Sequence, residues 1–227
     1  MNKVELFFDK VKEKLLKECS ECKGNSRVGD KSCKCLDTFE LYVQYFFRGI
    51  TPKYWDLTLE DDWKKDKATQ KQIVDYIEHL DNAYSYGLSL LFSGSNGVGK
   101  SMLMNIILKD AFKKGFKILY LDCRQLLDRA KFNDAITTDF LALDNFGDEQ
   151  EFIQRDTYVG KIKELVWSRI NSIKPTLIST NLNIDSINTT YGKTVYSYIV
   201  NTYKIIILSG ADFRKVAKNE WESLLLS

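Results

Sequence analysis

The sequence predicts an α/β fold, in which a five-stranded parallel sheet carries helices on both faces and follows a small N-terminal helical and metal-binding domain. Short apolar segments alternate with helical segments from residue 69 onward, which is typical of a parallel sheet. A glycine-rich loop follows the first of these apolar segments. Four of the five cysteines lie near the N-terminus. We expect an N-terminal domain over residues 1–50, a linker over 51–68 and the α/β core over 69–227.

Composition excludes several classes of protein. The chain has 227 residues, of which 44% are hydrophobic and 28% charged, as in an ordinary globular protein. Its apolar runs are too short to cross a bilayer, and charges interrupt the apolar residues of its N-terminus, so we expect a cytoplasmic protein without membrane contact. The net charge of +2 does not support strong binding to nucleic acid, although weak or conditional contact remains open.

The first helix is expected over residues 2–17, because apolar residues recur there at helical spacing. Phe7, Phe8, Val11 and Leu15 form one apolar face. This face packs either within the protein, which is the simpler alternative, or on a partner, as in helix-in-groove docking. Residues 36–70 are mixed and aromatic, and within them residues 49–55 are expected to form a turn and a connector.

The cysteine segment comes next. Cys19, Cys22, Cys33 and Cys35 form two close pairs, and four thiolates at such spacing can hold one structural Zn²⁺. Four unrelated reduced cysteines are the alternative. A disulfide framework is disfavoured in a reducing compartment.

The remaining elements follow in order. Strands are expected over residues 88–92, 116–121, 140–143, 176–179 and 204–208, and helices over 70–86, 100–114, 124–131, 158–172, 195–201 and 216–226.

Residues 94–101 match the phosphate-loop pattern G-x-x-x-x-G-K-S between a strand and a helix. Glycines let backbone N–H groups approach phosphate oxygens, and the helix N-terminus favours the same anion. Lys100 would reach the β- and γ-phosphates of ATP or ADP, and the Ser101 hydroxyl would bind Mg²⁺. The expected nucleotide contacts are Ser95, Asn96, Gly97, Val98, Gly99, Lys100, Ser101 and Met102.

A second motif completes this site. The apolar strand 140–143 ends at Asp144, which would hold Mg²⁺ through its water shell. We expect this strand and the phosphate-loop strand not to be neighbours in the sheet, as in the branch of P-loop ATPases that includes AAA+ and RecA-like proteins. Asn145 follows where that branch has an acidic residue. Because an amide cannot accept the proton of the attacking water, we expect ATP binding with slow hydrolysis, unless Asp148 or Glu149 substitutes. Asn181, at another strand end, contacts the γ-phosphate or is a turn residue.

These residues resemble the AAA+ core of the bacterial DnaC/DnaI replicative helicase loaders and their phage relatives. The matching segments are residues 94–101, 141–147, 168–171, 175–182 and 210–214, with 50–55 similar to the family's linker. The resemblance implies that Asn181 is sensor 1 and Arg214 is sensor 2. It also places Tyr198 where the family has its arginine finger, so catalysis lacks a cation there. Only 17 residues follow Gly210, and we therefore expect no helical lid.

The resemblance implies an ATP-binding loader that binds a hexameric replicative DNA helicase through its N-terminal domain and helps to place it on single-stranded DNA. It also allows homo-oligomers on the helicase. The alternatives are an IstB-like transposition helper ATPase and a nucleotide-binding protein that inhibits a helicase.

Overall fold

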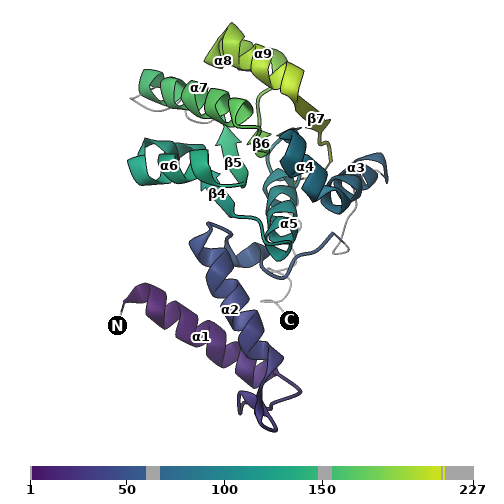
Figure 1. Ribbon diagram of the computed structural model, residues 1–227, viewed down its shortest axis with the longest axis vertical. Helices are drawn as coiled ribbons and strands as arrows, with labels where there is room; N and C mark the ends of the chain where they lie inside the picture. The colour runs from purple at the N-terminus through teal and green to yellow at the C-terminus, as the bar shows by residue number, and fades with distance from the viewer. Residues whose placement is uncertain (1, 60–66, 148–154, 211, 213–227) are drawn as a thin grey trace, which may run out of the picture. The chain divides into compact units, whose positions relative to one another are not determined.

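The computed structural model describes residues 2–59, 67–147, 155–210 and 212. It divides into two compact units, Met1–Asp56 and Leu57–Ser227 (Figure 1). None of the described helices is both long enough and apolar enough to cross a membrane.

The N-terminal unit is a helix pair joined by a small hairpin. Helix α1 (Lys3–Glu18) begins at a capping box formed by Asn2 and Glu5. Strands β1 (Arg27–Val28) and β2 (Lys31–Ser32) pair antiparallel and lead into α2 (Lys34–Phe47), and a 3₁₀ turn η1 (Pro52–Tyr54) follows. No helix was predicted in the segment that forms α2, which precedes the connector expected over residues 49–55.

Aromatic side chains join α1 to α2. Phe8 packs edge to face on Phe46 with ring centroids 5.1 Å apart, and Phe7 lies 6.0 Å from the same ring. Phe7 and Phe8 are only half-buried, and no residue of α1 is fully buried. The apolar face expected on the first helix therefore packs within its own unit, at least through these two residues.

The second unit contains the five expected strands in one parallel sheet of order β4-β5-β6-β3-β7. These strands are β3 (Ser89–Ser93), β4 (Ile118–Asp122), β5 (Phe140–Phe146), β6 (Thr176–Thr180) and β7 (Tyr203–Ile207). Every residue of β3 and β6 is buried, as expected of central parallel strands. Strand β6 lies between β3 and β5, which confirms that the strands of the two nucleotide motifs are not neighbours.

Helices cover both faces of this sheet. In Figure 1, α3 (Lys67–Glu78), α4 (Leu80–Tyr86) and α5 (Lys100–Lys113) lie on one side. On the other side lie α6 (Arg129–Thr137), α7 (Arg155–Asn171), α8 (Ile184–Tyr191) and α9 (Lys193–Thr202).

Two helix predictions need correction, and one further helix of this unit was not predicted. The helix expected over 70–86 is broken at His79, where φ is −107° and ψ is 33°. The segment expected as a helix over 124–131 is a 3₁₀ helix, η2 (Cys123–Leu127), followed by α6, which starts from the Asp128 cap. Helix α8 was not predicted, because its sequence is mostly polar. The helix expected over 216–226 lies outside the described residues.

One buried arginine connects several of these elements. Arg169 of α7 is 1% exposed. Its guanidinium donates to the hydroxyl of Thr176 (2.8 Å) and to the carbonyl oxygens of Ala135 (2.6 Å), Thr138 (3.0 Å), Asp139 (3.0 Å) and Pro175 (2.7 Å). These acceptors lie at the C-terminal part of α6 and around the starts of β5 and β6. Arg169 thus ties together the two strands that carry Asp144 and, just beyond β6, Asn181.

Candidate nucleotide site and cysteine cluster

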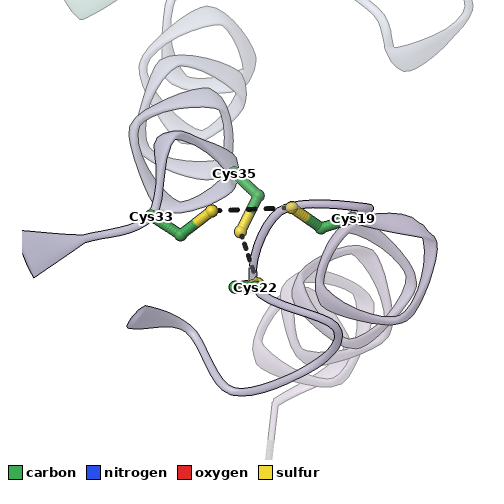
Figure 2. Close-up of side chains that lie close together, drawn as sticks. All are labelled: Cys19, Cys22, Cys33 and Cys35. Atoms are coloured by element: carbon green, nitrogen blue, oxygen red, sulfur yellow. Dashed lines mark hydrogen bonds between the residues drawn. The ribbon is translucent and has the colours of Figure 1, made fainter. Parts of the chain in front are cut away.

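The four N-terminal cysteines converge at the junction of α1, the hairpin and α2 (Figure 2). The Sγ atoms of Cys19 and Cys33 lie 3.5 Å apart and those of Cys22 and Cys35 lie 3.6 Å apart, and all four lie within 4.8 Å of one another. A disulfide needs about 2.05 Å. A tetrahedral zinc site with Zn–S bonds of about 2.3 Å needs sulfurs about 3.8 Å apart. The cluster therefore fits a structural zinc site.

The pKa values of two of these thiols are shifted in opposite directions. The pKa of Cys19 is lowered to about 7, chiefly by a hydrogen bond from the backbone of Cys22. Burial and the neighbouring thiols raise the pKa of Cys35 to about 12. Four thiolates so close together require a compensating cation, which zinc supplies because it deprotonates its thiol ligands.

The phosphate loop joins β3 to α5. Gly97 and Gly99 have φ values of +80° and +95°, which side chains with a Cβ rarely adopt. A Cβ on Gly97 would also overlap the carboxylate oxygen Oδ1 of Asp212, so the Asp212 side chain lies directly against the loop. Ser95 and Asn96 are exposed, and Val98 is buried. Ser101 and Met102 lie in the first turn of α5 and are half-buried.

Lys100 connects the loop to the end of β6. It is the first residue of α5 and is 8% exposed. Its Nζ donates to the carbonyl oxygens of Gly94 (2.6 Å) and Ser95 (2.8 Å) and to Oδ1 of Asn181 (2.7 Å). The structure thus brings Lys100 and Asn181 together, although they are 81 residues apart in the sequence.

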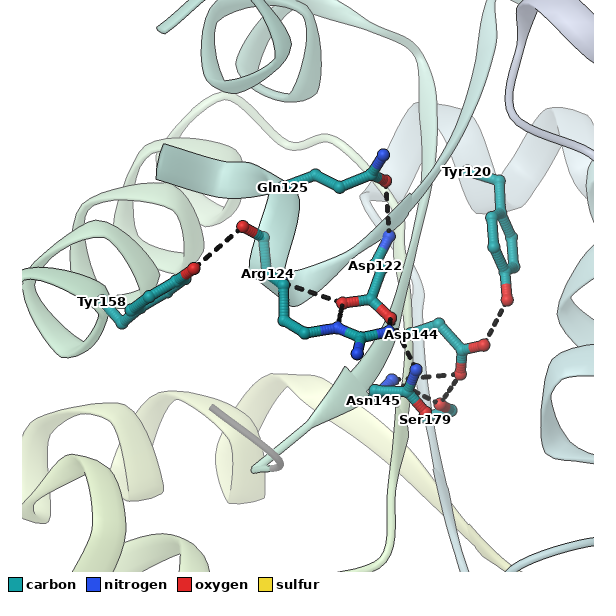
Figure 3. A network of polar contacts seen from close by, with 8 residues as sticks. All are labelled: Tyr120, Asp122, Arg124, Gln125, Asp144, Asn145, Tyr158 and Ser179. Atoms are coloured by element: carbon teal, nitrogen blue, oxygen red, sulfur yellow. Dashed lines mark hydrogen bonds and ion pairs between the residues drawn. The ribbon is translucent and has the colours of Figure 1, made fainter. Parts of the chain in front are cut away.

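Asp144 lies on β5 between two hydroxyl groups (Figure 3). Its carboxylate accepts hydrogen bonds from Tyr120 of β4 and Ser179 of β6, and also from the backbone N–H of Asn145 at 3.1 Å. Asp144 is 6% exposed. Tyr120 and Ser179 were not predicted as site residues, although each lies near the C-terminal end of a predicted strand. An oriented carboxylate at this edge of a parallel sheet is suited to Mg²⁺, which prefers oxygen ligands.

Asn145 does not continue the extended strand. Its φ is +60°, and the register of β5 shifts between Leu143 and Phe146. The amide Nδ2 donates to Oδ2 of Asp122 at 2.6 Å, and the backbone N–H also donates to Ser179 Oγ at 3.2 Å.

Asp122 in turn forms an ion pair with Arg124 at 2.5 Å. Burial alone would raise the pKa of Asp122, but the hydrogen bonds from Arg124 and Asn145 outweigh it and lower this pKa. Asp122 is therefore a second carboxylate beside Asp144, and it was not among the predicted site residues.

Tyr198 is the residue expected at the arginine-finger position. Tyr198 on α9 is half-buried and packs against the hydrophobic core, so its side chain is a packing residue in this structure. Arg214, Asp148 and Glu149 lie outside the described residues.

Three solved structures share this architecture. The structure titled "Crystal structure of the DnaC helicase loader" matches with a TM-score of 0.60 at 23% identity, over 70% of this chain and 100% of that one. A crystal structure of DnaI matches with a TM-score of 0.59 at 18% identity, over 71% and 93% of the two chains. The replication initiator DnaA bound to AMPPCP and single-stranded DNA matches with a TM-score of 0.57 at 15% identity, over 76% of this chain and 56% of that one.

No protein-family model and no curated protein matches this chain. Because the sequence identities are below 25%, these structural similarities show the fold alone. Together with the strand order and the phosphate loop between β3 and α5, they show that the chain has a P-loop AAA+ core, as the sequence predicts.

Proposed function

We propose that this chain is an ATP-binding helicase loader, which binds a replicative DNA helicase and helps to place it on single-stranded DNA. The observation that carries the proposal is the match to the DnaC helicase loader, which extends over the whole of that chain. The N-terminal cysteine unit and the phosphate loop support it, since they supply a separate docking unit and a nucleotide switch.

The nucleotide half of the proposal assigns a role to each residue around the loop. The loop backbone and the N-terminus of α5 bind the phosphates, and Lys100 exchanges its carbonyl partners for the β- and γ-phosphate oxygens. Ser101 and Asp144 hold Mg²⁺, which neutralises phosphate charge when it is bound. Asn181 lies at Lys100 and can donate its amide hydrogens to the γ-phosphate. Because Asn145 is an amide, hydrolysis is slow and the nucleotide acts mainly as a switch.

The docking half of the proposal rests on the N-terminal unit. Zinc held by the four cysteines fixes the junction between α1 and α2. Phe47, at the end of α2, is 70% exposed and stacks against Phe8 with ring centroids 6.2 Å apart, and Val4 is 37% exposed one turn before Phe8. Exposed aromatic residues on a rigid unit are the usual anchors of a protein interface. We infer that this apolar surface binds the helicase.

A binding experiment with the purified replicative helicase tests the docking half of the proposal. The full-length chain should bind the helicase, and Phe47→Ser should weaken binding about 10-fold or more, as expected for an interface anchor. Tyr86→Ser is the matched control, because Tyr86 is an aromatic residue that is 73% exposed on the other unit. Failure of the full chain to bind the helicase, or equal effects of the two variants, would contradict the proposed docking surface.

Addition of single-stranded DNA to the mixture of this chain and the helicase distinguishes a loader from an inhibitor. A loader increases the amount of helicase bound to a single-stranded DNA circle, whereas an inhibitor lowers it. Binding to a transposase rather than to a helicase would favour the IstB-like alternative.

A further inference from the structure

The acidic side chain that is missing after Asp144 has a counterpart on the neighbouring strand. Asp122 is the last residue of β4 and is paired in register with Asp144 on β5. The left-handed backbone of Asn145 places its amide against Asp122, with Nδ2 2.6 Å from Oδ2 (Figure 3). An ionised carboxylate only accepts hydrogen bonds, so the nitrogen end of the amide must face Asp122. The carbonyl oxygen Oδ1 of Asn145 is then the end of the amide directed away from Asp122.

Both partners of this pair are held in place. Asp122 accepts from Nε of Arg124 at 2.5 Å, from Nη2 at 2.6 Å and from the backbone N–H at 2.9 Å. Its own backbone N–H donates to the side chain of Gln125 at 3.0 Å. On the other side, the backbone N–H of Asn145 is bonded to Asp144 and Ser179. Asn145 is therefore held from β4 through its side-chain amide, and from Asp144 on β5 and Ser179 on β6 through its backbone N–H.

We propose that Asp122 is a positioning residue for ATP hydrolysis, whose carboxylate fixes and polarises the Asn145 amide so that Oδ1 accepts a hydrogen bond from the attacking water. The inference rests on the proposed ATP-binding function and deepens it. A carboxylate that accepts from an amide N–H shifts electron density toward the amide oxygen, which makes that oxygen a better acceptor. A carboxylate–amide pair thus replaces the single acidic side chain.

The pair orients water but removes no proton. The water oxygen forms a bond to the γ-phosphorus, the bond to the β–γ bridging oxygen breaks, and ADP leaves. The proton of the water passes to an oxygen of the released phosphate, since the amide cannot take it. This division of roles explains how the chain can hydrolyse ATP slowly without a base directly after Asp144.

Four full-length proteins test the pair: the parent chain, Asp122→Asn, Asn145→Asp and the double variant. Asp122→Asn retains a capping oxygen for η2 while it removes the charge. Asp128→Asn is the matched control, because Asp128 also caps a helix, accepting from the N–H groups of Ala130 and Lys131. ATP affinity is measured with a fluorescent ATP analogue, and hydrolysis by single-turnover release of labelled phosphate.

Asp122→Asn should lower the hydrolysis rate about 10-fold or more and change ATP affinity less than about 2-fold, because it disturbs the positioning of water and not the binding of phosphate. Asp128→Asn should hydrolyse ATP like the parent. Asn145→Asp alone sets two carboxylates against each other, whereas the double variant restores a carboxylate–amide hydrogen bond with the two groups exchanged. The double variant should therefore hydrolyse ATP faster than Asn145→Asp.

The inference is overturned if Asp122→Asn hydrolyses ATP at the same rate as Asp128→Asn, or if the double variant hydrolyses ATP no faster than Asn145→Asp. It is also overturned if the parent chain binds ATP but hydrolyses it no faster than Lys100→Ala. If the parent chain itself does not bind ATP, the proposed function is refuted instead.

Discussion

Replacement of Arg169 by methionine tests whether one buried guanidinium holds the strands that carry the nucleotide site. Burial lowers the pKa of Arg169 to about 10, so the group remains charged at neutral pH. Among the described residues, its hydrogen-bond partners are backbone carbonyls and the Thr176 hydroxyl, with no carboxylate. Methionine is unbranched and flexible and replaces the aliphatic part of the arginine side chain, but it donates no hydrogen bond.

The expected cost follows from the acceptors that lose their donor. Five acceptors lie within 3.0 Å of the guanidinium, and an unsatisfied buried acceptor costs about 1 kcal/mol or more. The Pro175 carbonyl also accepts from the N–H of Leu141 at 3.4 Å, so the other four acceptors give a sum of about 4 kcal/mol. Relief from burying a charge returns part of this, so Arg169→Met should lower the free energy of unfolding by about 2–4 kcal/mol. For a unit of this size the midpoint of thermal unfolding should fall by about 10 °C.

Urea unfolding followed by far-UV circular dichroism measures this change. Arg129→Met is the matched control, because Arg129 is exposed on α6, and it should change the free energy of unfolding by less than about 0.5 kcal/mol. A loss below about 1 kcal/mol for Arg169→Met would refute the reasoning, since it would mean that water or a small rearrangement satisfies these acceptors.

Three further predictions concern the two candidate sites. Purified protein should contain about one zinc per chain by elemental analysis, and Cys22→Ser should lose the metal; a parent protein without zinc would contradict the assignment. Lys100→Ala should abolish binding of a fluorescent ATP analogue, whereas unchanged affinity would place the nucleotide elsewhere. Asp212→Ala should tighten binding of the same analogue, because it removes a negative charge that lies against Gly97 in the loop that binds phosphates, and weaker binding would show that Asp212 contributes to the site instead.

The sequence predicted the sheet well, because each central strand has a short apolar segment, bounded by helical segments. Strand β3 is an example, since its five residues are all buried. The helix α2 was missed although its sequence carries a helical signal. Tyr42, Tyr45 and Phe46 are spaced i, i+3 and i+4, which predicts one face of a helix, and Phe46 packs on α1 in the structure.

The motifs along the chain identified candidate residues of the nucleotide site but not their partners. Asp144 was found from its position at the end of an apolar strand. Tyr120 lies 24 residues before it and Ser179 lies 35 residues after it, so no local pattern links them. Asp122 was missed in the same way, since its contact with Asn145 depends on the left-handed backbone and on the pairing of β4 with β5.

The positive φ of Asn145 restricts which residues natural variation can place there. Asparagine, aspartate and glycine tolerate the left-handed region, whereas a longer acidic residue such as glutamate pays a penalty of about 1–2 kcal/mol. The codons of asparagine and aspartate differ in a single base, so a carboxylate at this position is one mutation away. That mutation alone would bring it against Asp122. A change at Asp122 would therefore have to precede or accompany the change of Asn145 to aspartate. The order of these two mutations, and not their number, limits the evolution of faster hydrolysis.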